Sequence, residues 1–163
     1  MNDVALISIE PASAAIAGSR IMARALEALA AANAEVLTFS SSSYRQSFCF
    51  LVRRAEVEKV TEQIEAGLAL EFAHGYLKPL DVNLQVGLLA VVGEGMRGSS
   101  GLAGRIFSAI SRQNVNIIAI AQGSSEMTIS IVVHRDGLER AIRAIHEECG
   151  LRALNAVVAE QAI

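Results

Sequence analysis

The sequence has few aromatic residues and no tryptophan. Aromatic side chains make up 4% of the 163 residues, whereas the hydrophobic fraction reaches 52% and is mainly aliphatic. Proteins that hold single-stranded nucleic acid stack its bases on aromatic side chains, and such a face is missing here. Basic residues number 14 against 17 acidic residues, a net charge of −3 without a basic block. We therefore predict a tight aliphatic core and no nucleic-acid partner.

Long apolar segments and metal-type clusters are missing as well. The longest strongly apolar stretches, residues 86–92 and 115–121, are far shorter than the roughly 20 residues that cross a bilayer. The first residues lack the positive charge of a secretory signal. Cys49 and Cys149 lie far apart without the spacing of a zinc site or a disulfide framework. We expect a cytoplasmic protein with no membrane partner, no metal and no cofactor.

An internal repeat organises the chain. Residues 33–40 match residues 114–121, at an offset of 81 positions, and the same offset places residues 48–52 on 129–133. A repeat of this length indicates two copies of one supersecondary unit.

Apolar periodicity predicts the same elements in each copy. In the first copy we expect strands at residues 4–9, 36–40, 48–52 and about 76–84, and helices at 16–32 and 55–70. In the second we expect strands at 86–92, 115–121, 127–133 and 151–158, and helices at 102–113 and 137–149. The predicted fold class is α+β: two ferredoxin-like βαββαβ modules with antiparallel sheets, residues 1–84 and 85–163. Uncovered sheet faces and edges favour dimerisation.

A glycine-rich loop at residues 93–98 satisfies the G-x-G-x-x-G pattern of dinucleotide binding between a strand and a helix. That pattern also needs an acidic residue about 20 positions later, at the end of the next strand. Here that strand ends at residues 120–123, with no carboxylate until Glu126, which we interpret as an ordinary turn residue. We therefore favour a simpler use, in which Ser99 or Ser100 caps the following helix near Gly101 and exposed N–H groups there attract a carboxylate.

Other catalytic patterns are missing from the sequence. There is no phosphate-binding G-x-x-x-x-G-K-[ST] pattern. His74, His134 and His146 fall in different predicted elements without spaced partners, and Glu147 and Glu148 end an amphipathic helix. We predict no catalytic residues.

The segment 91–107, VVGEGMRGSSGLAGRIF, resembles the start of the second ACT module of aspartate kinases, where a V-G-x-G-M-x-x-x-x-G run leads into the first helix. The similarity continues through residues 114–126 and 129–133 and closes at 144–148. The resemblance is specific, particularly to the type of regulatory region found in monofunctional enzymes and in those fused to homoserine dehydrogenase. The resemblance implies that a kinase domain lies upstream and that this chain alone has no kinase activity.

The first copy departs from the family pattern at two places. Residues 11–15 stand where family members have a glycine-rich loop, and Ser41 stands where they have a glutamine. The family also places a short strand before the first module that completes the sheet of the second. We expect residues 151–158 to fill that place here.

The resemblance implies allosteric feedback inhibition by a pathway amino acid, threonine or lysine, and a homodimer formed through the ACT modules. The ligand carboxylate would sit on N–H groups within the helix-start segment formed by Met96, Gly98, Ser99, Ser100, Gly101 and Leu102. Its ammonium group would find acceptors at Asn116 and the backbone of Ile117, and Gln122 would bond to its side chain.

Two other functions stay open. The first alternative is a structural dimerisation module with a vestigial ligand site. The second is a small nucleotide-binding enzyme that uses the 93–98 loop.

Overall fold

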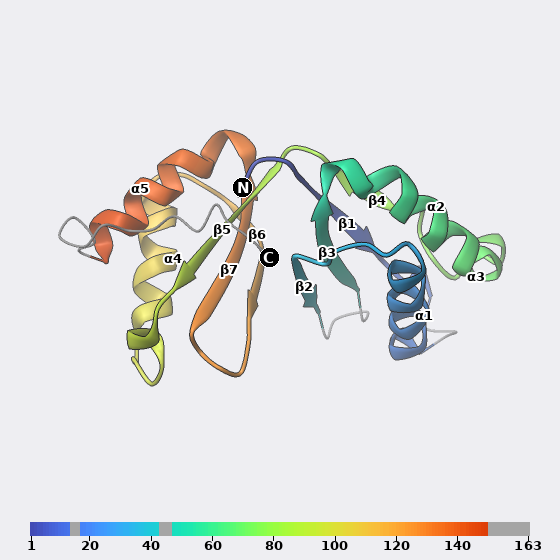
Figure 1. The fold of residues 1–163 in the computed structure, drawn as a ribbon, viewed down its shortest axis with the longest axis horizontal. Helices are drawn as coiled ribbons and strands as arrows, with labels where there is room; N and C mark the ends of the chain where they lie inside the picture. The colour runs from blue at the N-terminus through green and yellow to red at the C-terminus, as the bar shows by residue number, and fades with distance from the viewer. Residues whose placement is uncertain (14–16, 43–46, 150–163) are drawn as a thin grey trace. The chain divides into compact units, whose positions relative to one another are not determined.

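The computed structural model describes residues 1–13, 17–42 and 47–149. Two compact units form (Figure 1). We call Asp3–Leu84 the N-terminal unit, and the C-terminal unit consists of Met1–Asn2 together with the chain from Gln85 onward. No helix among the described residues is long and apolar enough to span a bilayer.

The N-terminal unit places its helices on one face of a four-stranded sheet. Its elements are β1 (Val4–Ile9), α1 (Gly18–Ala31), β2 (Thr38–Ser41), β3 (Phe48–Arg53), α2 (Val57–Gly67), α3 (Ala69–Ala73) and β4 (Asp81–Asn83). The strand order is β2-β3-β1-β4, and neighbouring strands are antiparallel. Ile21 of α1 and Ile64 of α2 pack on Ile7 and Phe50 of the sheet, all fully buried.

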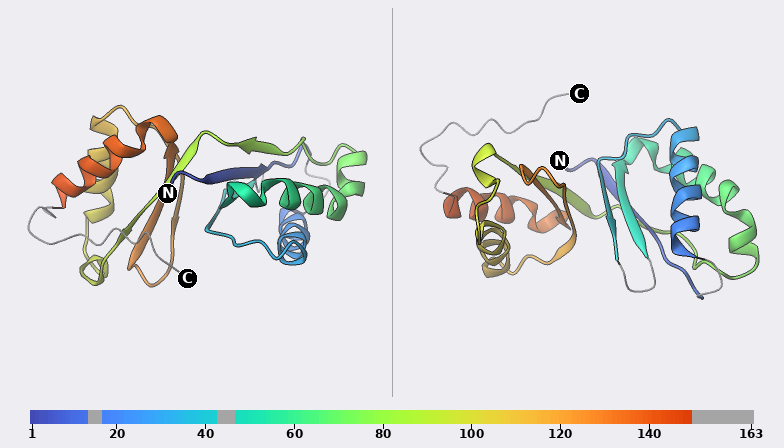
Figure 2. Two further views of the ribbon diagram at one scale, coloured as in Figure 1. Left: turned by 45° about the horizontal axis from the view of Figure 1, so that its top comes forward. Right: turned by 90° about the horizontal axis from the view of Figure 1, so that it is seen from below.

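The C-terminal unit repeats this design with three described strands. Its elements are β5 (Val86–Val92), α4 (Leu102–Arg112), β6 (Ile117–Gln122), β7 (Thr128–His134) and α5 (Leu138–Glu148), with strand order β5-β7-β6. Ile106 and Ile110 of α4 and Ile145 of α5 cover Leu89 and Ile131 of the sheet. In each unit both long helices lie on the same face of the sheet (Figure 2). Each buried aliphatic side chain contributes roughly 1.5–3 kcal/mol, so this face stabilises the unit.

The repeat recurs in detail. The helix α2 and the short 3₁₀ turn before it, Arg54–Glu56, reappear 81 positions later as α5 and the turn Arg135–Gly137. Asn33 and Asn114, also 81 apart, both have positive φ, 47° and 53°, just after the ends of α1 and α4. Asparagine tolerates this left-handed conformation and commonly ends helices. The predicted fold class, α+β with antiparallel βαββαβ modules, is confirmed.

Two predicted elements of the first copy differ from the structure. The helix expected at 55–70 breaks at Leu68, whose φ and ψ of −114° and 21° are not helical. Gly67, a poor helix former, ends α2, and its missing side chain lets Ala28 of α1 come close. The strand expected at 76–84 is reduced to β4 and one bridge from Leu77 to Pro11, because Pro79 cannot donate a ladder hydrogen bond.

The outer edge of β5 carries the first residue of the chain. The Met1 amino group donates to the Leu88 carbonyl at 2.8 Å, and the Leu88 N–H donates to the Met1 carbonyl at 3.0 Å. In the N-terminal unit, Leu6 of β1 pairs with β3 at the position where Leu88 of β5 pairs with β7. On its other side, Leu6 lies opposite Asn83 of β4. Met1 thus takes the place beside β5 that β4 takes beside β1. The strand expected at 151–158 lies outside the described residues.

Candidate functional site

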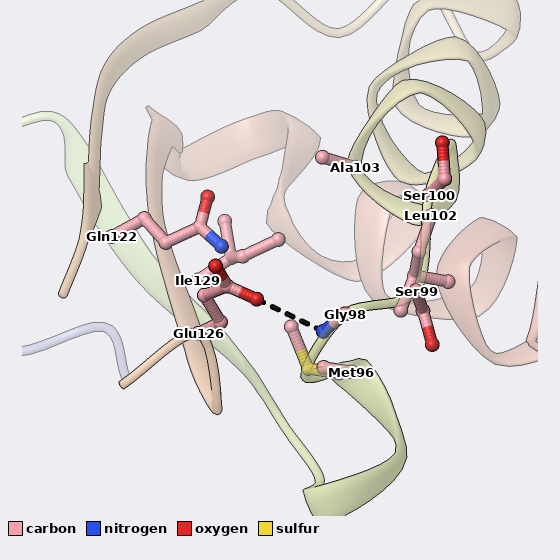
Figure 3. A pocket seen from close by; sticks show the side chains of 9 residues that line it. All are labelled: Met96, Gly98, Ser99, Ser100, Leu102, Ala103, Gln122, Glu126 and Ile129. Carbon is pink, nitrogen blue, oxygen red and sulfur yellow. Dashed lines mark hydrogen bonds between the residues drawn. The ribbon is translucent and has the colours of Figure 1, made fainter. Parts of the chain in front are cut away.

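A pocket of about 290 Å³ opens beside the N-terminal end of α4 (Figure 3). It is lined by residues of the β5–α4 loop, of the first turn of α4 and of the β6–β7 hairpin: Met96, Gly98, Ser99, Ser100, Leu102, Ala103, Gln122, Glu126 and Ile129. Small-molecule pockets span roughly 300 to 1,000 Å³, so this volume suits a small metabolite.

The loop between β5 and α4 owes its shape to two glycines. Gly98 and Gly101 have φ of 68° and 83°, in the left-handed region that side chains rarely adopt. A Cβ added at either glycine would meet no atom within 4 Å, so backbone conformation and not space requires glycine there. The turn is closed by backbone hydrogen bonds from Met96 to Gly93 and from Ser99 to Met96, both at 3.1 Å.

The first turn of α4 has no side-chain cap. Gly101 is the N-cap residue, no side chain bonds to the free N–H groups, and the first turn holds no acidic residue. Ser99 instead bonds through Oγ to the Gly95 carbonyl at 2.5 Å. The expectation that Ser99 or Ser100 caps this helix is therefore wrong, because the left-handed Gly101 starts the helix itself. The positive end of the helix stays open beside Ala103 of the pocket.

Gln122 reaches the pocket from the end of β6. It pairs with Ile129 of β7, and directly paired residues of antiparallel strands share a face. Ile129 is buried at the base of the pocket on the face that the helices cover, whereas Gln122 is exposed at its rim. An amide that both donates and accepts thus stands beside an apolar floor.

Glu126 joins the two loops that border the pocket. It sits in the β6–β7 hairpin with a φ of 58°, and its Oε2 accepts a hydrogen bond from the Gly98 N–H at 2.9 Å (Figure 3). One signal for it is visible in the sequence, a carboxylate four positions after Gln122, but that position alone indicates an ordinary turn residue. Its closeness to Gly98 depends on β5 and β7 being neighbours, which local patterns do not reveal.

The structure brings six of the nine predicted site residues to the pocket: Met96, Gly98, Ser99, Ser100, Leu102 and Gln122. Gly101 lies just outside the lining, as the N-cap of α4. Asn116 and Ile117 are not brought there. Ile117 pairs with Val133 at the far end of β6, and five extended residues place it about 16 Å from Gln122. Glu126, Ala103 and Ile129 are the lining residues that the sequence did not predict.

In the part of the chain that the structure describes, titratable residues away from the pocket form no second site. Among the described residues there is no group of three histidine, cysteine or acidic side chains that would hold a metal ion. Cys49 and Cys149 are free and half-buried, and burial raises the pKa of both thiols. These thiols are therefore poorly ionised near neutral pH and suit a packing role.

Strand pairing argues against a dinucleotide site at the 93–98 loop. The dinucleotide fingerprint needs a parallel βαβ unit, in which the strand before the loop and the strand after the helix run the same way beside each other. Here β5 pairs antiparallel with β7, which also separates β5 from β6. The pocket instead offers a helix end that attracts anions, a carboxylate that attracts cations, and an amide. Those groups are complementary to a small zwitterion.

The chain is similar to one known domain family and to several known proteins. Residues 89–149 match the ACT domain family. The bifunctional aspartokinase/homoserine dehydrogenase of Haemophilus influenzae is 42% identical over 112 residues, which are 69% of this chain and 14% of that protein. The chloroplastic bifunctional aspartokinase/homoserine dehydrogenase 1 of Arabidopsis thaliana is 34% identical over 147 residues, 90% of this chain and 16% of that protein. The chain thus spans only a small part of these relatives.

Solved structures share the fold. The regulatory subunit of aspartate kinase from Thermus thermophilus superposes with a TM-score of 0.75 at 24% identity, covering 91% of this chain and 94% of that one. The aspartate kinase from Synechocystis gives a TM-score of 0.75 at 28% identity, covering 96% of this chain and 27% of that one. The chain belongs to the ACT-domain family and corresponds to the regulatory region of aspartate kinases, not to their catalytic domain.

Proposed function

We propose that the pocket beside α4 binds a free amino acid, threonine or lysine, and that this binding controls an attached kinase domain by feedback inhibition. The open N-terminus of α4 supports the proposal most strongly. Leu102 and Ala103 of its first turn line the pocket, and no side chain caps the helix there. The N–H groups of a helix start are the groups that bind an α-carboxylate. Gln122, at the rim, would bond to the hydroxyl of threonine or the amine of lysine.

Control of a kinase requires only a difference in affinity between two arrangements of the modules. A ligand that prefers one arrangement shifts the population toward it, and a coupling of roughly 1–3 kcal/mol changes the affinity at a second site about 5- to 150-fold. We propose that residues 1–84 and 85–163 are the two modules, that they associate as a homodimer, and that the kinase domain precedes them in a cytoplasmic enzyme.

We further propose that only the second module binds the effector. Ser41 is the last residue of β2, as Gln122 is the last residue of β6, and the two are 81 positions apart. A serine hydroxyl is too short to replace the amide of glutamine. The first module also has residues 11–15, which begin with a proline, in place of the glycine loop.

Titration of Gln122→Ala with threonine and with lysine by calorimetry tests this assignment. One lost hydrogen bond is worth about 0.5–1.5 kcal/mol, so we expect Kd to rise roughly 2- to 13-fold for the true effector. Gln113→Ala is the matched control, because Gln113 is exposed at the opposite end of α4. Affinity that is unchanged in Gln122→Ala would remove this residue from the site.

A further inference from the structure

The pocket contains a single ionisable side chain. Of its nine lining residues only Glu126 carries a charge at neutral pH, and the others are glycine, serine, amide or apolar residues. Figure 3 shows its carboxylate between the Gln122 amide and Gly98, on the pocket side of the hairpin. The field inside the pocket is therefore set by one negative charge opposite the positive end of α4.

Contacts on both sides fix this arrangement of charge. The Gly98 N–H is already held by Glu126 Oε2, and the Ser99 N–H donates to the Met96 carbonyl. A ligand carboxylate is thus directed away from the loop and toward the first turn of α4, where no side chain competes. An ammonium group is directed toward Glu126.

We propose that Glu126 makes the pocket select amino acids by their charge, an inference that rests on the proposed amino-acid binding. Its carboxylate holds an ammonium group of the effector and rejects amino acids that carry a second carboxylate, aspartate among them. The kinases related to this chain are named for aspartate. A regulatory pocket of such an enzyme must stay free of aspartate while it responds to another amino acid, and like-charge repulsion achieves this discrimination.

The test compares Glu126→Gln with the wild-type chain, by calorimetry with lysine, threonine and aspartate at low salt. Glutamine keeps the shape and an acceptor for the Gly98 N–H but removes the charge. We expect lysine affinity to fall by roughly two- to fivefold, the size that an exposed charge pair supports. Threonine affinity should fall less, and aspartate affinity should rise. These differences should shrink at high salt.

Two further variants serve as controls. Glu94→Gln removes the same charge from the neighbouring β5–α4 loop. Glu94 is exposed, as Glu126 is, but it lies outside the pocket lining, so the order of affinities should not change. Glu126→Asp keeps the charge in a residue that also tolerates positive φ, and it should keep the preference for lysine over aspartate.

Three results would overturn the inference. Equal weakening of all three ligands in Glu126→Gln means that Glu126 only supports the loop, and the amino-acid function then stands. An affinity order that changes as much in Glu94→Gln means that overall charge, not Glu126, sets the preference. Failure of the wild-type chain to bind any of the three amino acids overturns this inference and the proposed function together.

Discussion

The ion pair between Arg24 and Glu71 connects α1 with α3, and its removal should destabilise the N-terminal unit. Glu71 is the buried charged residue among those described, at 7% exposure. Arg24 donates one hydrogen bond to Glu71 Oε1 and another, of 2.6 Å, to the Gly67 carbonyl. Glu71 Oε2 has no hydrogen-bond partner. Arg24→Ala therefore leaves a carboxylate buried without any counter-charge.

The loss of stability in Arg24→Ala depends on how deeply each member of the ion pair is buried. Breaking a buried pair costs about 3–5 kcal/mol, but the Arg24 side chain is 38% exposed and water will replace part of its contact. We expect a loss of about 2 kcal/mol, where each kcal/mol lowers Tm by roughly 4–8 °C in a unit of this size. Urea denaturation and thermal melting followed by circular dichroism measure it.

Two variants separate this cause from a general effect of losing an arginine. Arg20→Ala removes an exposed arginine of the same helix and should change stability by less than about 0.5 kcal/mol. The double variant Arg24→Ala with Glu71→Met removes the stranded charge and should recover most of the loss. If Arg24→Ala is as stable as Arg20→Ala, the ion pair does not stabilise the unit and the reasoning is refuted.

Two other substitutions probe the C-terminal unit. Hydrogen bonds from Arg105 and then Arg112 lower the pKa of Glu148, so its stabilisation is complete at neutral pH and is lost as pH falls below 4.5. Urea midpoints should therefore separate Glu148→Gln from wild type at pH 7, and the gap should close as pH falls below 4.5. A gap that stays constant would contradict this. Gly98→Ala should lower the free energy of unfolding by about 1–2 kcal/mol, because alanine rarely adopts the positive φ of this position. Gly95→Ala should not, although a Cβ at either glycine meets no atom within 4 Å. Equal melting temperatures of the two variants would contradict this prediction.

Local patterns predicted most of the fold because the repeat supplied each element twice. The strands β1, β3, β5 and β7 and the helices α4 and α5 lie within one or two residues of their predicted ranges. The break at Leu68 was missed, because apolar spacing continues through Leu68 and Leu70 although the backbone does not remain helical. The position of Met1 beside Leu88 depends on a contact between distant parts of the chain, which no local pattern reports.

The pocket was predicted in outline, but its lining residue Glu126 was not. The loop and Gln122 were found through a motif, whereas Glu126 needed knowledge that the hairpin folds back over the loop. Asn116 has suitable chemistry, but it lies just before β6, at the end of the strand opposite Gln122. Residue type thus identified candidate groups, and strand register decided which of them meet.

A thermal-shift measurement with the common amino acids, ATP and NAD tests the central claim most directly. A ligand at about 100 times its Kd stabilises the native state by roughly 2.7 kcal/mol, so threonine or lysine should raise the melting temperature clearly, and ATP and NAD should not. If no amino acid raises it, the chain is a structural dimerisation module with a vestigial pocket. If only a nucleotide raises it, the 93–98 loop is a nucleotide site and the account is contradicted.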